Sequence, residues 1–101
     1  MKELPLACTL GADALSRREG EVRRLFEDAL VDSRLDGGRL ALRFRGDATE
    51  RVKALAAAER ECCAFLGVSV DPGPVLVLEA PEGAETTVAG FAALADQALR
   101  V

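Results

Sequence analysis

The segment Arg39–Arg45 constrains the fold of this 101-residue chain more than any other, because large apolar residues occupy every second position. In a strand, Leu40, Leu42 and Phe44 share one face, while Ala41 shares the other face with three arginines. We interpret that second face as solvated or paired with a helix; its arginines are Arg39, Arg43 and Arg45. A sheet built on such a strand has one apolar face that helices have to cover.

Helix and strand patterns alternate along the rest of the chain. Before the strand at Arg39–Arg45, the patterns predict an edge strand at Leu4–Leu10 and a helix over about 13–34, which Asp36-Gly37-Gly38 ends. After it, they predict a helix that runs from a capping box at Asp47–Glu50 to Leu66. Two strands at 68–70 and 75–79 follow, joined by a turn at 71–74, and the last predicted helix covers 84–100. The order β-α-β-α-β-β-α predicts one α+β domain over residues 1–101. We expect a two-layer sandwich, with helices on one face of a small mixed or antiparallel sheet. A second copy, in a homodimer, is one way to cover an exposed apolar face of the sheet.

Charge and composition exclude several classes of function. The net charge is −4, which argues against nucleic acid as a partner because phosphate binding normally needs a basic face. No apolar stretch reaches the roughly 20 residues of a membrane span, and the first ten residues do not resemble a signal peptide, so we expect a cytoplasmic protein. With no histidine, Ser-His-Asp and Cys-His catalysis are excluded. The sequence contains no glycine-rich phosphate loop, so no motif of this kind indicates an organic cofactor.

The candidate functional residues lie in the segment Glu59–Leu66, which holds two adjacent cysteines on a predicted helix. Steps of seven residues from the apolar stripe of that helix lead to Glu59, Cys62 and Cys63. Both thiols therefore fall on or beside the inward face. A carboxylate falls there too, where packing alone would favour an apolar residue.

Three interpretations of the cysteines stay open. The first is that they are small core residues, since free cysteine is often buried. The second is a thiol oxidoreductase or redox switch, which includes a disulfide from Cys8 to one of the pair. The third is a thiolate site for a soft metal or metalloid ion, with Cys8, Cys62 and Cys63 as ligands. No catalytic residue is assigned, and the sequence leaves turnover open.

Bonding chemistry favours the third interpretation. Neighbouring α-carbons are about 3.8 Å apart, below the roughly 4.4 Å minimum usual for a disulfide. The dipole at a helix C-terminus also opposes an activated thiolate, and no histidine compensates. Three thiolates without imidazole suit mercury, arsenic(III) or copper(I), whereas structural zinc and iron–sulfur clusters want four ligands.

Two motifs resemble those of a known family. Cys8-Thr9-Leu10 and Glu59-Arg60-Glu61-Cys62-Cys63-Ala64-Phe65-Leu66 are similar to the C-T-L start and the E-R-x-C-C-x-F-L core of a family of small bacterial proteins associated with heavy-metal and mercury-resistance gene neighbourhoods. The similarity also includes an arginine that follows the C-T-L start, here Arg18, and the resemblance implies a site built from Cys8, Arg18, Glu59, Cys62 and Cys63. Gly67-Val68 follows the core here, where the family has an aromatic residue.

Arg18 also falls on the inward side of its predicted helix, three residues after Leu15 and four before Val22. We expect it to pair with Glu59. The alternative role is to balance the negative charge of bound thiolates or of an anionic ligand. Around the three cysteines, Glu59 and Arg18 are therefore the residues expected to tune or close the site.

Overall fold

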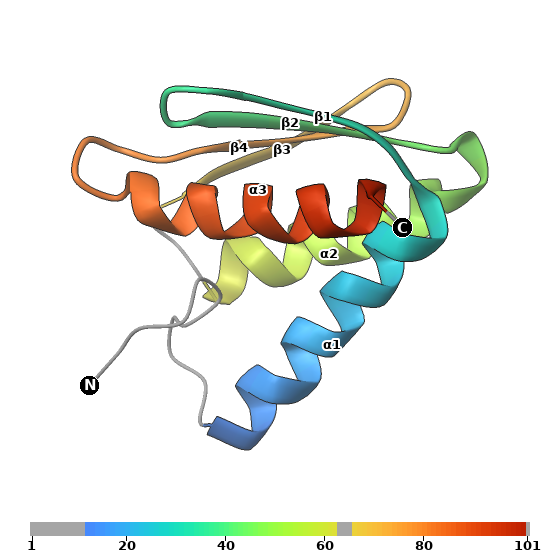
Figure 1. The fold of residues 1–101 in the computed structure, drawn as a ribbon, viewed down its shortest axis with the longest axis horizontal. Coiled ribbons are helices and arrows are strands. Elements are labelled where there is room, and N and C mark those ends of the chain that lie inside the picture. The colour runs from blue at the N-terminus through green and yellow to red at the C-terminus, as the bar shows by residue number, and fades with distance from the viewer. Residues whose placement is uncertain (1–11, 63–65, 101) are drawn as a thin grey trace.

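The computed structural model describes residues 12–62 and 66–100, except for the side chains of residues 12–18 and 62 (Figure 1). Its elements, in chain order, are α1 (Ala12–Ala29), β1 (Leu30–Asp36), β2 (Arg39–Phe44), the 3₁₀ helix η1 (Gly46–Ala48), α2 (Thr49–Cys62), β3 (Gly67–Asp71), β4 (Val75–Glu79) and α3 (Glu85–Leu99). The strand predicted at Leu4–Leu10 lies outside the described residues.

The described strands form one sheet in the order β1-β2-β4-β3, and each neighbouring pair is antiparallel. The helices α1, α2 and α3 all lie on the same side of this sheet (Figure 1). The predicted α+β class is confirmed, and the described strands follow the antiparallel alternative. Within the described residues, β2 and β4 are central strands, while β1 and β3 are its two edges.

The first helix is shorter than the sequence predicted. Helix was expected to about residue 34, whereas α1 ends at Ala29 and the next seven residues form β1. These residues pair with β2 across a two-residue turn, Gly37-Gly38. Gly37 has a φ of 62°, which the first central position of a type II′ hairpin turn requires. Hydrogen bonds to β2 therefore decide the conformation of a segment whose own helical pattern had already ended.

The core lies between the sheet and the helices, as the alternation in β2 predicted. Leu40, Leu42 and Phe44 are buried on the face toward the helices. The same cluster takes Leu76 and Leu78 from β4. Ala48 of η1 and Leu66 also belong to the cluster. The α-helices supply the rest, and their buried core residues are Val22, Leu25, Phe26, Ala29, Val52, Leu55, Ala56, Val88, Phe91, Leu94 and Ala95.

The face of the sheet away from the helices is polar at its borders. All three arginines of the predicted row are exposed, which confirms the solvated interpretation. Arg39 lies opposite Glu79 on β4, and Nε and Oε2 are 3.7 Å apart. At the centre of this face, Val77 is buried beside the small side chain of Ala41.

Candidate functional site

The C-terminal end of α2 carries the part of the predicted site that the structure describes. Val52, Leu55, Ala56 and Glu59 follow the spacing of one helix face, and all four are buried. Glu59 is 1% exposed, so the predicted inward position of this carboxylate is confirmed. A buried acidic group among core residues needs polar partners or a function, because removing charge from water is costly. The last residue of α2, Cys62, follows Glu59 by three positions.

This end of α2 is fixed against the sheet. Arg60 donates a hydrogen bond from Nε to the carbonyl oxygen of Val68 on β3, at 3.2 Å. Leu66, immediately before β3, is 5% exposed and belongs to the core. The chain is therefore held on both sides of residues 63–65. A site at this end of α2 has a rigid support.

The structure tests only part of the predicted ligand set. It brings Glu59 and the backbone of Cys62 into one turn of α2. Cys8 and Cys63 lie outside the described residues, and Arg18 is placed on α1 by its backbone alone. Among the described side chains, which include none of the three cysteines, no cluster of three or more metal-ligating residues occurs. Convergence of the thiols and pairing of Arg18 with Glu59 remain predictions.

A groove between α1 and α2 was not predicted from the sequence. Its volume is about 350 Å³, and its lining residues are Glu21, Val22, Arg24, Leu25, Arg51, Ala54, Leu55 and Ala58. Ala54 and Ala58 lie one turn apart on α2, and their small side chains leave the space that the longer residues of α1 border. The alanine-rich middle of α2 was the signal in the sequence. Cys62 follows Ala58 by a further turn, beyond the residues that line the groove.

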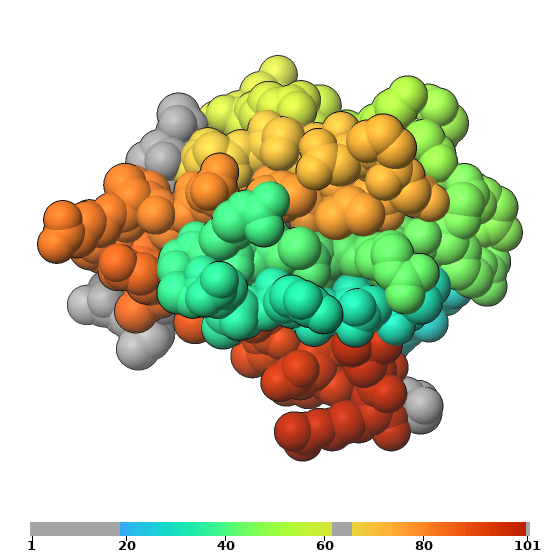
Figure 2. Space-filling view, turned by 90° about the horizontal axis from the view of Figure 1, so that it is seen from above, coloured from blue at the N-terminus to red at the C-terminus, as the bar shows by residue number. Residues whose placement is uncertain are grey.

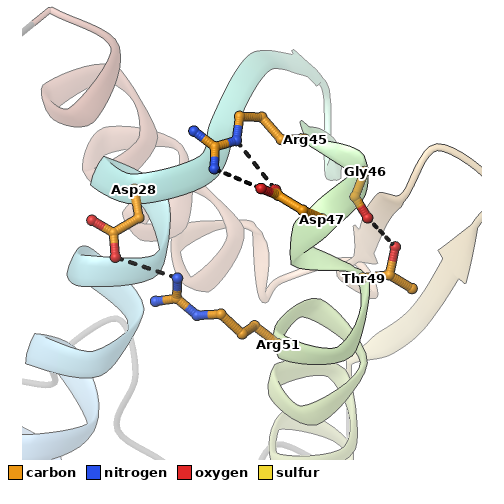
Figure 3. A network of polar contacts seen from close by, with 6 residues as sticks. All are labelled: Asp28, Arg45, Gly46, Asp47, Thr49 and Arg51. Carbon is orange, nitrogen blue, oxygen red and sulfur yellow. Dashed lines mark hydrogen bonds and ion pairs between the residues drawn. The ribbon is translucent and has the colours of Figure 1, made fainter.

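The opposite end of α2 carries an exposed polar network (Figure 3). Arg45 donates from Nε and Nη2 to the two carboxylate oxygens of Asp47, at 3.2 and 2.9 Å. Thr49 donates from Oγ1 to the carbonyl oxygen of Gly46 at 2.8 Å, and Arg51 pairs with Asp28 of α1 at 3.3 Å. The predicted capping box is therefore wrong, because Asp47 lies within η1 and binds Arg45.

The hydrogen bonds from Arg45 lower the pKa of Asp47, and those to Asp47 raise the pKa of Arg45. A carboxylate with a lowered pKa stabilises the fold above its ordinary pKa, and this contribution is lost as the pH falls through the lower value. We expect Asp47→Asn to lower the urea midpoint slightly at pH 7. The difference from the wild type should disappear in acid, and a difference that is constant with pH would contradict the expectation.

Arg45→Gln supplies the matched control for this pair, since either substitution removes the same contact. The double variant should lose no more stability than either single variant. A surface pair of this kind contributes little to stability. We therefore assign the network to the junction of β2 and α2 and give it no chemical role.

Comparisons with known proteins do not identify the chain. No family model matches the sequence, and neither a curated protein nor a solved structure matches it. None of the described helices is long and apolar enough to cross a membrane. The proposals below therefore depend on the residues themselves.

Proposed function

We propose that this protein binds a soft metal or metalloid ion through the thiolates of Cys8, Cys62 and Cys63. The observation that carries the proposal is the burial of Glu59, in the same turn of α2 as Cys62, at a helix end fixed to the sheet. Packing alone gives no reason for a carboxylate at that position. A ligand site at the end of α2 does give one.

The ligand set favours thiophilic ions. Sulfur ligands select soft ions, and three thiolates suit mercury(II), arsenic(III) or copper(I). Glu59 and Arg18 are the residues of this chain that would adjust the charge around the thiolates. A reducing compartment such as the cytoplasm keeps the thiols free for this role.

The same residues serve a redox switch less well. A bond between Cys62 and Cys63 would strain the peptide, and Cys62 lies at the C-terminal end of α2, where the helix dipole disfavours a lone thiolate. A bound cation removes that penalty, because the ion itself stabilises the deprotonated sulfur.

Native mass spectrometry of the freshly reduced protein tests the proposal directly. We expect one ion per chain when mercury(II), arsenite or copper(I) is added. Binding should release protons and weaken at low pH, because the ligands have to be deprotonated. Magnesium added at the same concentration should not bind, since it prefers oxygen ligands.

Two outcomes would contradict the proposal. One is the absence of a bound ion for all three soft metals. The other is rapid, reversible loss of thiols with peroxide in a protein that binds none of them, which would assign the cysteines to redox chemistry.

A further inference from the structure

Strand β1 forms one edge of the described sheet. No described strand pairs with its outer side, because β2 is the only neighbour of β1 in the sheet of the described residues. Figure 2, which looks down on the face away from the helices, shows the C-terminal part of α3 projecting past this edge. Unpaired strand edges are templates for pairing with another chain.

Hydrogen bonds on the other side of β2 show which of its residues bond toward β1. The N–H of Phe44 donates to the carbonyl oxygen of Pro74 at 3.0 Å, and the carbonyl oxygen of Gly38 accepts from the N–H of Ala80 at 2.9 Å. Both even-numbered residues therefore bond toward β4. Successive residues of an antiparallel strand bond to alternate sides, so the odd-numbered residues of β2 bond toward β1. Arg45, next in that series, donates to Ala29 at 2.9 Å, as this alternation requires.

The same alternation shows which backbone N–H and C=O groups of β1 do not bond to β2. Asp32, Arg34 and Asp36 lie opposite the odd-numbered residues of β2 and bond to them. Ser33 and Leu35 consequently direct their N–H and C=O groups away from β2. The hydrogen-bonding groups available on this edge are centred on Ser33.

Exposed hydrophobic side chains gather along this edge. Three large hydrophobic residues are exposed among the described residues: Val31 at 43%, Leu35 at 47% and Leu99 at 40%. Two of them are in β1 and the third ends α3, the helix that packs against β1. The large exposed apolar side chains of the described residues therefore belong to β1 and to the end of the helix packed against it, which is what a contact along this edge would cover.

We propose that two copies of this chain pair through β1, in antiparallel register about a two-fold axis at Ser33. The two sheets then become one continuous eight-stranded sheet, with both sets of helices on the same side. In this register Val31, at the irregularity of β1 between Leu30 and Asp32, comes beside the partner's Leu35, so pairing brings the two exposed hydrophobic residues of the strand together. Asp32 lies opposite the partner's Arg34, so each dimer gains two contacts between opposite charges.

Charge selects this register over its neighbours. Moving the axis by one residue, to Asp32 or to Arg34, places two aspartates or two arginines directly opposite each other. Like charges in that position are destabilising. The charges of β1 therefore oppose these two alignments. An axis at Leu35 also places Arg34 opposite the partner's Asp36, but it leaves Val31 beyond the end of the partner's β1 and so uncovered.

The other edge lacks these features. β3 has only five residues, Gly67–Asp71, and no positively charged residue. Its two valines are partly buried against the core, whereas the hydrophobic residues of β1 are exposed. Self-pairing of β3 thus gains neither opposite charges nor cover for exposed apolar surface.

Sedimentation velocity over a concentration series tests the dimer. We expect wild-type protein to dimerise and Arg34→Asp to raise the dimer dissociation constant by at least about tenfold, because both symmetry-related contacts become repulsive. Lys53→Asp makes the same change of charge on an exposed position of α2 and should leave the dimer intact. Circular dichroism verifies that each variant is folded.

A mixing experiment makes the test specific to the register. Asp32→Lys should also dissociate, whereas an equal mixture of Asp32→Lys with Arg34→Asp should form a heterodimer, since every opposed pair is then of opposite charge. Ser33→Pro is a second route if a charge variant misfolds, because it removes an N–H that β2 does not use. A monomeric wild type, or an Arg34→Asp protein that dimerises as tightly as Lys53→Asp, would overturn the proposal.

Discussion

Replacing Cys62 and Cys63 together by serine is expected to abolish tight binding of mercury(II). Two of the three proposed ligands lose their soft, readily deprotonated sulfur, while the size of each side chain stays nearly unchanged. We expect the affinity to fall by more than about 100-fold, since loss of outer-shell partners alone costs about 10- to 100-fold. Competition titration against a thiol chelator measures the affinity, and circular dichroism measures folding.

Further variants locate the site within the chain. Cys8→Ser should weaken binding and leave a two-thiolate site at the end of α2. Glu61→Gln changes an exposed carboxylate one residue from the pair and should leave the affinity unchanged. Wild-type stoichiometry and affinity in the Cys62→Ser/Cys63→Ser protein would refute the proposed ligand set.

Replacing Phe26 by alanine is expected to lower the free energy of unfolding by about 3–5 kcal/mol. Phe26 is 1% exposed on α1, and its ring centroid lies 5.8 Å from that of Phe44 on β2. The substitution removes a buried aromatic side chain and leaves a cavity where α1 meets the sheet. A loss of that size is a large part of the roughly 5–15 kcal/mol by which domains are usually stable. Urea unfolding measures it.

Glu27→Ala is the matched control, because it truncates the exposed neighbouring residue of the same helix. We expect its effect to stay within about 0.5 kcal/mol. The Phe26→Ala/Phe44→Ala double variant should reveal a coupling of about 0.5–1.5 kcal/mol between the tilted rings. Equal small losses for Phe26→Ala and Glu27→Ala would show that α1 is not anchored through this side chain.

The C-terminal end of α2 and the proposed dimer contact lie at opposite edges of the described sheet. The end of α2 is bound to β3, while the dimer uses β1 at the other edge. Pairing of two copies therefore leaves the end of α2 uncovered. Cysteine variants should still dimerise, and charge variants of β1 should still bind metal, so the two proposals fail or succeed separately.

Side-chain periodicity predicted much of the architecture. The alternation of β2 identified the buried face, and the apolar stripe of α2 correctly predicted that Glu59 lies inward. The turn at 71–74 and the last helix were also located correctly. These features follow from spacing along the chain, because the period of a strand or helix decides which residues share a face.

Contacts distant in sequence decided the rest. The segment Leu30–Asp36 is a strand because it pairs with β2. Asp47 binds Arg45, although its spacing to Glu50 predicted that it would cap α2. The groove beside Ala54 and Ala58 exists only because α1 crosses α2 there.

The sequence by itself determined which faces of the strand and helices are buried and which residues are candidate ligands. It also excluded the catalysis that requires histidine, because the chain has none. Only the tertiary structure decided that Glu59 is held at a fixed helix end, and that β1 presents Val31 and Leu35 on an edge that no other described strand pairs with. The physical reason is that periodicity is a local property, whereas burial, strand pairing and edges depend on which distant segments meet.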